Sequence, residues 1–198
     1  MNIIRIDHDN QVNGNGLRAV VWCAGCSHNC PLCQNSEAQN PDIGTPYGDW
    51  VKEDLKKELD RDEISGVTFS GGEATFIPNR KDATDLMKWI KDNYPHKSIW
   101  VYTGYYYEEI KDLPMMQYID VLIDGPYIQK YNPGKGKLKW RGSANQRVID
   151  VKKTREQGKV IWIRDFNGKY IYENEEHVND DIYLIQTEGI CRSCGEEK

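Results

Sequence analysis

The feature that most constrains the fold is an alternation of strand-like and helix-like segments between residues 17 and 125. Apolar, β-branched runs are followed by segments whose apolar residues recur every three or four positions. This order is typical of an α/β protein in which right-handed crossovers build a mainly parallel sheet, either open or closed into part of a barrel. The predicted strands are 17–23, 64–70, 98–104 and 118–125, and the predicted helices are 49–61, 80–93 and a short one within 106–113.

The chain divides into one domain and a smaller C-terminal appendage. Its 198 residues suffice for a single continuous core. The segment RVIDV at 147–151 can add one more short strand, and the pattern changes after it. Two alternating β runs then surround Asn167-Gly168, which is a strong hairpin signal. We therefore predict a domain at 1–151 and an appendage at 152–198 that ends in a Cys-x-x-Cys tail, Cys191 to Cys194.

Charge and hydropathy exclude several classes of partner. The formal net charge of -5 gives no basic footprint, so we expect no binding to nucleic acid. The N-terminal segment MNIIRIDHDNQVNG has no basic region followed by an apolar one, and no apolar run approaches the roughly 18 residues that span a bilayer. We expect a cytoplasmic protein without a membrane partner. In that reducing compartment, clustered cysteines bind metals or act in catalysis more often than they form disulfides.

Four of the six cysteines fall within the segment WCAGCSHNCPLC, directly after the predicted strand 17–23. The spacing permits two Cys-x-x-Cys pairs, which suggest zinc, or a C-x-x-x-C-x-x-C triplet with Cys23 left over, which suggests an iron-sulfur cluster. The three residues between Cys26 and Cys30 make it cramped to wrap both pairs around one zinc ion. One of these pairs could instead share a zinc ion with Cys191 and Cys194.

The triplet has a specific chemical consequence. Three cysteines on a four-iron cluster leave one iron without a protein ligand. A ligand with an amino and a carboxylate group could chelate that iron, and a methionine sulfonium bearing those groups would then lie beside an electron source. This arrangement is the one used by S-adenosylmethionine radical enzymes.

The segment CSHNCPLC resembles the signature of the radical S-adenosylmethionine superfamily. Further blocks resemble, in order, those of the activating enzymes of anaerobic (class III) ribonucleoside-triphosphate reductase. They are VNGNGLR, GCSHNCPLCQN, SGGEAT, IWVYTGY, YIDVLIDGPY and WRGSANQR. The resemblance covers residues 1 to about 150. It implies a partial barrel of five or six parallel strands with helices outside.

The resemblance also implies an activity and its cofactors. A 4Fe-4S cluster on Cys26, Cys30 and Cys33 would cleave S-adenosylmethionine by one-electron reduction. The resulting 5′-deoxyadenosyl radical would generate a glycyl radical on the reductase large subunit, the expected partner. The electron would come from a flavodoxin- or ferredoxin-type donor. The cofactor-binding residues that we expect are Leu32, Cys33, Gln34, Gly71, Gly72, Glu73, Asp124 and Arg141.

The reasons for these cofactor-binding residues differ. Glycines in SGGEAT let the backbone approach a ligand closely, and the related segment receives the methionine amino group. The backbone of Leu32 is expected to face the adenine. Asp124-Gly125 is either a strand-ending turn or the floor of the site. The loop 140–143, which holds Arg141, is expected to contact S-adenosylmethionine or the reductase.

Other residues allow an ordinary structural interpretation. Cys23 shares the face of Val21 on the predicted strand, so we expect a buried core thiol. His28 lies inside the triplet, where we expect a hydrogen-bonding or partner-facing role. Cys191 and Cys194 could share zinc between chains, form a redox pair, supply a fourth ligand or lie in a tail without function.

Two alternative functions stay open at the level of sequence. The first is an activase of another glycyl-radical enzyme, of the pyruvate formate-lyase type, or a radical enzyme that acts on a small molecule. The second is a non-catalytic zinc-binding interaction module. In that module one cysteine pair of 23–33 would join Cys191 and Cys194 to hold the tail on the core.

Overall fold

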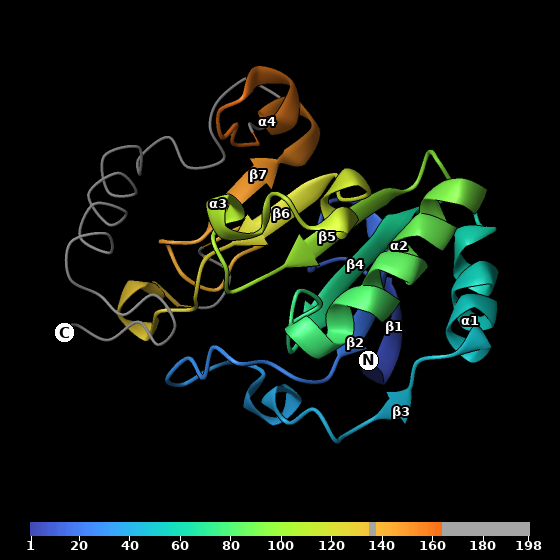
Figure 1. The fold of residues 1–198 in the computed structure, drawn as a ribbon, viewed down its shortest axis with the longest axis horizontal. Coiled ribbons are helices and arrows are strands. Elements are labelled where there is room, and N and C mark those ends of the chain that lie inside the picture. The colour runs from blue at the N-terminus through green and yellow to red at the C-terminus, as the bar shows by residue number, and fades with distance from the viewer. Residues whose placement is uncertain (135–137, 164–198) are drawn as a thin grey trace.

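A mixed seven-stranded sheet forms the centre of the molecule (Figure 1). The computed structural model describes residues 1–134 and 138–163. The strand order is β3-β1-β2-β4-β5-β6-β7. The strands are β1 (Asn2–Asn10), β2 (Leu17–Cys23), β3 (Thr45–Pro46), β4 (Ile64–Gly71), β5 (Ser98–Tyr102), β6 (Val121–Asp124) and β7 (Arg147–Asp150). The α-helices are α1 (Asp49–Leu59), α2 (Arg80–Asn93), α3 (Tyr107–Ile110) and α4 (Val151–Gln157), and the 3-10 helices are η1 (Ser36–Gln39), η2 (Ile77–Asn79), η3 (Pro114–Gln117) and η4 (Gln129–Tyr131).

The parallel part of the sheet is smaller than predicted. Within the described ranges, β2, β4, β5 and β6 run parallel, so there are four such strands rather than five or six. β1, β3 and β7 each pair antiparallel with their neighbours. β7 runs antiparallel because no crossover α-helix separates it from β6 in the described part of 125–146. The prediction of an α/β class is confirmed.

The central elements follow the sequence pattern closely. The observed bounds of β2 and α2 coincide with the predicted 17–23 and 80–93, and RVIDV supplies β7. β1 and α4 were not predicted. The β-branched Ile3, Ile4 and Ile6 are typical of a strand and could have indicated β1. α4 begins within the predicted domain and continues past residue 152, so the division at 151/152 stays a prediction.

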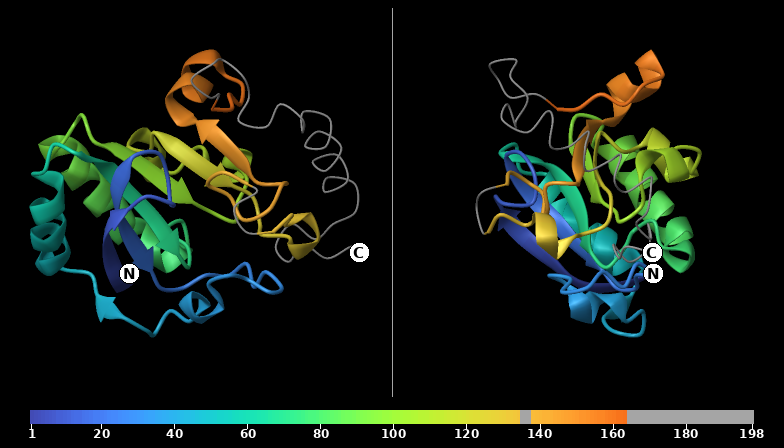
Figure 2. Two further views of the ribbon diagram at one scale, coloured as in Figure 1. Left: turned by 180° about the vertical axis from the view of Figure 1, so that it is seen from behind. Right: turned by 90° about the vertical axis from the view of Figure 1, so that its left-hand side faces the viewer.

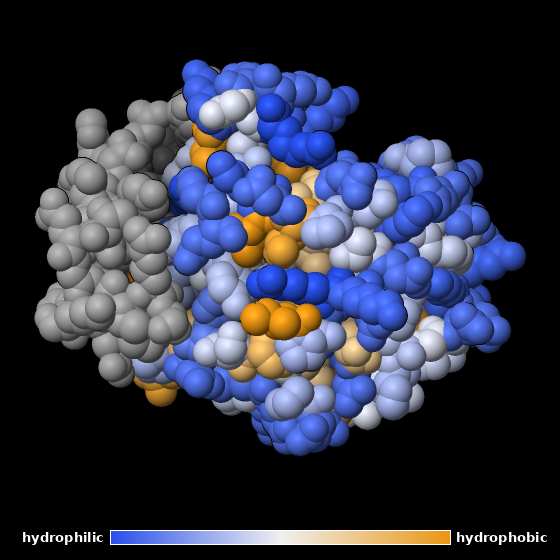
Figure 3. Space-filling view, in the orientation of Figure 1, coloured by the Kyte–Doolittle hydropathy of each residue, from blue (hydrophilic) through white to orange (hydrophobic). Residues whose placement is uncertain are grey.

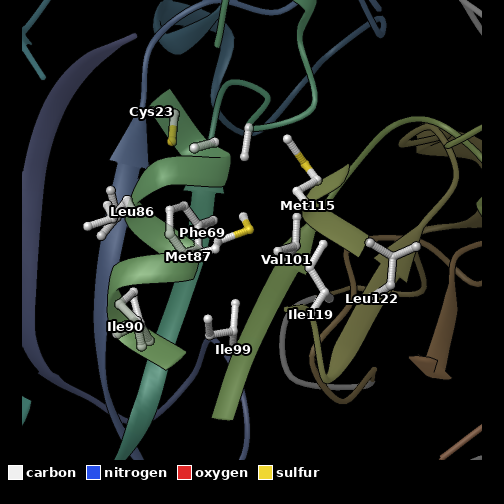
Figure 4. Close-up of a cluster of buried hydrophobic side chains, with 14 of the residues drawn as sticks. Cys23, Phe69, Leu86, Met87, Ile90, Ile99, Val101, Met115, Ile119 and Leu122 are labelled. Atoms are coloured by element: carbon white, nitrogen blue, oxygen red, sulfur yellow. The ribbon is translucent and has the colours of Figure 1, made fainter. Parts of the chain in front are cut away.

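One face of the sheet carries the main core. α1 and α2 cover this face, which is turned toward the viewer in Figure 1 and away from the viewer in the left view of Figure 2. Their apolar side chains meet alternate residues of the parallel strands, such as Val21 and Phe69. Figure 4 shows Phe69, Leu86 and Met87 packed together, all fully buried. This packing holds the central strands in a fixed order and so fixes where their carboxyl ends lie.

The opposite face is bound together by a buried arginine at the amino-terminal ends of the strands. Arg18 is fully buried, and its guanidinium donates to Thr68 Oγ1 at 2.8 Å, Val67 O at 3.0 Å and Ser98 O at 2.8 Å. Burial lowers the pKa of this side chain to about 10. Arg18 therefore links β2, β4 and β5 and leaves the carboxyl-terminal end of the same face free for a cavity.

The remaining predictions concern the C-terminal segment, membrane spans and the surface. The hairpin at Asn167-Gly168 and the pair Cys191 and Cys194 lie outside the described residues. Among the described residues, no helix combines the length and apolarity needed to cross a membrane. The face seen in Figure 3 is mostly hydrophilic, with small separate hydrophobic areas.

Replacing Leu86 with Ala tests the main core. Leu86 is fully buried, so Leu86→Ala should lower the free energy of unfolding by about 2 to 5 kcal/mol through lost burial and the cavity that remains. Leu32→Ala is the matched control, because Leu32 is 76% exposed, and it should leave stability unchanged. Urea denaturation followed by circular dichroism measures both. Equal losses in the two variants would contradict the assignment of the core.

Candidate metal and cofactor site

A cavity of about 590 Å³ lies at the carboxyl-terminal ends of the parallel strands. Its walls include Trp22 near the end of β2, residues 70–73 at the end of β4 and just after it, residues 102–104 at the end of β5 and just after it, and Gly125 after β6. Small-molecule sites commonly measure about 300 to 1,000 Å³, and α/β folds place them at this edge of the sheet. The volume and position therefore suit a small ligand.

Three cysteines line this cavity from the loop that follows β2. Cys26, Cys30 and Cys33 are partly exposed free thiols. The backbone amide of His28 donates to Cys26 Sγ at 3.5 Å, and that of Asn35 donates to Cys33 Sγ at 3.4 Å. Amide donation to sulfur is one of the means by which proteins tune the potential of iron-sulfur clusters.

The donor set fits an iron-sulfur cluster by its chemistry. Three thiols that face one cavity are soft ligands of the type that iron-sulfur clusters use. Burial raises the pKa of Cys26 to about 12 and also raises that of Cys30, so metal binding must displace thiol protons. In the described part of the chain, no three His, Cys, Asp or Glu side chains form a group that could hold a metal ion as it stands.

Cys23 is separated from the other three cysteines. Its side chain is fully buried in the main core, where Figure 4 shows it beside the cluster that contains Phe69 and Leu86. Burial raises the pKa of this thiol to about 12. The prediction of a buried core thiol at the end of β2 is confirmed.

The glycine-rich segment after β4 packs directly against the start of the cysteine loop. Gly72 N donates to Cys23 O at 2.7 Å. Gly71 has φ of +95°, and a Cβ there would lie 2.7 Å from the same carbonyl oxygen. A Cβ on Gly72 would lie 2.5 Å from Ala38 O, so neither position accepts a side chain without displacement of the backbone.

The side chain of Asn79 joins the same two segments. Its Nδ2 atom donates to Ala24 O at 2.8 Å and to Glu73 O at 2.9 Å, and the residue is 3% exposed. On the other side of the loop, Gly25 N donates to Ala38 O at 2.8 Å. The start of the cysteine loop is thus held between the glycine-rich segment and η1.

Glu73 connects the loops after β4 and β5. Its carboxylate accepts hydrogen bonds from Gly104 N at 2.8 Å, from Thr75 N at 3.2 Å and from the Thr75 hydroxyl. The residue is 1% exposed, and Thr75 Oγ1 lies 2.9 Å from Thr103 Oγ1. The Glu73 carboxylate is therefore directed mainly toward protein donors while the residue still contributes to the cavity wall.

Most of the predicted cofactor residues meet at the cavity. Arg141 is held from inside its loop, because Nη1 donates to Ala144 O at 2.8 Å and to Gln146 O at 2.7 Å. Two of the predicted residues, Leu32 and Asp124, do not line the cavity. Leu32 has a left-handed backbone conformation, with φ of +55°. Of the eight residues predicted, the six that line the cavity are Cys33, Gln34, Gly71, Gly72, Glu73 and Arg141.

Asp124 lies in a buried ion pair. Its carboxylate accepts from Arg147 Nε at 2.9 Å and from Tyr107 N at 2.7 Å, and Arg147 also pairs with Glu108 at 2.8 Å. Burial raises the pKa of Asp124, and the guanidinium of Arg147 opposes that shift. The ion pair holds β6 against β7 and α3. Gly125, which follows Asp124 in the chain, lines the cavity, whereas Asp124 does not.

Sequence reasoning singled out only part of the aromatic wall: Trp140 belongs to the loop 140–143 that was expected at the site, whereas Trp22, Tyr102 and Tyr127 were given no site role. Trp22 precedes Cys23 and points to the opposite face of β2, so strand alternation could have indicated it. Tyr102 belongs to the IWVYTGY block, and Tyr127 and Trp140 lie on the loop between β6 and β7. No periodic pattern in that loop indicates which of its side chains face inward.

Comparison with known proteins identifies the class. A family described as "4Fe-4S single cluster domain" matches residues 12–149, the part of the chain that contains the cavity. By fold and site, the chain is an iron-sulfur α/β protein.

Three relatives narrow the family further, and all bear the name anaerobic ribonucleoside-triphosphate reductase-activating protein. That of Enterobacteria phage T4 is 41% identical over 75% of this chain and 93% of its own length. That of Haemophilus influenzae is 34% identical over 74% of this chain and 96% of its own length. That of Escherichia coli K12 is 33% identical over 69% of this chain and 90% of its own length. The chain belongs to the family of anaerobic ribonucleoside-triphosphate reductase-activating proteins.

Alanine substitutions distinguish the cysteines. Cys30→Ala should abolish cluster assembly, because it removes a thiol from the cavity wall. Cys23→Ala should retain wild-type iron and sulfide content and cost about 1 kcal/mol of stability, since Cys23 lies in the core. Iron and acid-labile sulfide analysis after anaerobic reconstitution measures the difference. Equal loss of iron in both variants would contradict the separate role of Cys23.

Arg147→Met tests the buried ion pair through its pH dependence. The variant leaves Asp124 buried without its cation, so stability should fall by about 3 to 5 kcal/mol at neutral pH. The pKa of Asp124 then rises further, the folded state binds a proton that the unfolded state releases, and stability decreases as pH rises through that pKa. The loss should be smaller at about pH 5 than at about pH 8. Lys88→Met, which breaks the exposed pair with Asp92, should show neither effect.

Proposed function

We propose that this chain activates anaerobic ribonucleoside-triphosphate reductase by generating a glycyl radical on its large subunit. The cluster ligands in this proposal are Cys26, Cys30 and Cys33. The cofactor is S-adenosylmethionine, and the electron comes from a flavodoxin- or ferredoxin-type donor. The curated relatives, which carry the activating-protein name, support the choice of partner.

One observation carries the proposal. The three cysteines and the Gly71-Gly72 backbone line the same cavity, although they belong to different strand ends. A cluster on the cysteines and a cofactor on the glycine-rich segment would therefore be neighbours. The iron-sulfur description of the matched family supports the cluster.

The groups have separate tasks in this proposal. When bound, the cluster and S-adenosylmethionine supply a one-electron reductive cleavage and a 5′-deoxyadenosyl radical that removes hydrogen from a glycine. The half-buried backbone of Gly71 and Gly72 receives the amino group of the methionine moiety through carbonyl oxygens. Asn79 keeps that backbone beside the cysteine loop. Trp22, Tyr102 and Trp140 exclude water from the reacting atoms.

We extend the proposal to the fold. The four parallel strands, with α1 and α2 on one face and the cavity on the other, are compatible with a partial barrel of the radical S-adenosylmethionine type. In this view residues 1–151 form the radical domain and 152–198 form the appendage. A cytoplasmic location stays a prediction.

Anaerobic reconstitution and reduction test the function. The reconstituted chain should be brown, should release 5′-deoxyadenosine when reduced with S-adenosylmethionine, and should produce a glycyl radical on the reductase by electron paramagnetic resonance. A colourless protein with stoichiometric zinc would reject the proposal in favour of the zinc-binding module. Cleavage with a radical on pyruvate formate-lyase but none on the reductase would favour the other activase class.

A further inference from the structure

His28 is a buried histidine whose role neither the fold nor the proposed ligand set explains. It lies between Cys26 and Cys30 and is 6% exposed. Its ring makes an edge contact with Tyr105, with 4.4 Å between ring centroids. The Nε2 atom is buried without a hydrogen-bond partner, and the residue lines the cavity. A buried polar atom without a partner destabilises a fold, so its retention points to a task within the site.

The nearest charged group to this nitrogen belongs to a different loop. His28 Nε2 lies 3.3 Å from Glu73 Oε2, close enough for an ion pair but without hydrogen-bond geometry. The same oxygen of Glu73 accepts from Gly104 N at 2.8 Å. The cysteine loop, the glycine-rich segment and the loop after β5 therefore meet at one carboxylate.

Gly104 makes this meeting sterically possible. A Cβ on Gly104 would lie 2.4 Å from His28 Cδ2, closer than real Cβ contacts allow. The backbone conformation of Gly104 is not left-handed, so the need for glycine is one of space rather than of dihedral angle. The imidazole thus fills a place that the loop after β5 leaves open for it.

We propose that His28 is a positioning residue that acts through Glu73: the imidazole fixes the Glu73 carboxylate, and through it the Gly71-Gly72 backbone that receives S-adenosylmethionine. This inference rests on the proposed function and assigns a residue that the cluster ligands do not include. The separation of 3.3 Å between Nε2 and Glu73 Oε2 is short enough that a small rotation of the imidazole completes a hydrogen bond to the carboxylate.

A double-mutant cycle on the full, anaerobically reconstituted chain tests this coupling. The variants are His28→Leu, Glu73→Gln, the double substitution, and His28→Gln, which keeps a side-chain donor. His96→Leu is the matched control, because His96 is exposed on the surface. The measurements are iron and sulfide content, the dissociation constant of S-adenosylmethionine by equilibrium dialysis, and the cofactor-induced change in the electron paramagnetic resonance spectrum of the reduced cluster.

The expected result separates cofactor binding from cluster binding. All variants should load iron as the wild type does. His28→Leu should weaken S-adenosylmethionine binding about tenfold, which is the size of one lost charged hydrogen bond, and should require correspondingly more cofactor for the spectral change. His28→Gln should recover part of the affinity. The double variant should bind no more than about twofold more weakly than Glu73→Gln alone, because the two residues act on one another.

Three outcomes would overturn the inference. They are wild-type affinity in His28→Leu, additive effects in the cycle, and loss of iron from His28→Leu or His28→Gln with the fold retained, which would assign the imidazole to the cluster. A wild-type chain that neither binds nor cleaves S-adenosylmethionine would reject the proposed function itself. A wild type that cleaves the cofactor beside an unaffected His28→Leu would reject only the role of His28.

Discussion

The site depends above all on the contact between the ends of two neighbouring parallel strands. β2 and β4 end side by side, and Gly72 N donates to Cys23 O at 2.7 Å. Asn79 adds a second link, since its amide donates both to Ala24 O and to Glu73 O. These few bonds determine that the cysteine loop and the glycine-rich segment leave the sheet together and bound one cavity. Neither loop has regular structure that could maintain this arrangement alone.

The two ends of the sheet divide stability and chemistry between them. At the amino-terminal ends, Arg18 satisfies its guanidinium with strand carbonyls and hydroxyls. At the carboxyl-terminal ends, backbone groups and thiols face the cavity, and Asp124 with Arg147 supports its floor. A rigid sheet whose amino-terminal strand ends are joined by hydrogen bonds, and whose carboxyl-terminal strand ends border a cavity, is suited to hold ligands at fixed positions. The loops carry the groups that can bind ligands, and the strands set the distances between these loops.

Sequence reasoning predicted the elements whose pattern is local. The apolar stripe of α2 and the β-branched run of β2 depend on neighbours in the chain, and both were predicted with correct bounds. The direction of β7 was not accessible, because it depends on how the loop from 125 to 146 returns to the sheet. The cysteines were recognisable by their spacing, and the glycines of SGGEAT by their place at the end of a predicted strand and by resemblance to a family block. The pairing of His28 with Glu73 was not, because it joins residues 45 positions apart through loop geometry.

Burial of Cys23 has a consequence for oxidative damage. Four thiols within twelve positions would, if equally accessible, offer oxygen several ways to form wrong disulfides once iron is lost. The Cys23 sulfur is fully enclosed in the core, so oxidants and the other thiols do not reach it. Within the segment 23–33, oxidation is thereby confined to the three cysteines of the loop, and β2 keeps its packing around Cys23. For this segment, repair then requires only that the loop thiols be reduced again, while the core around Cys23 is unchanged.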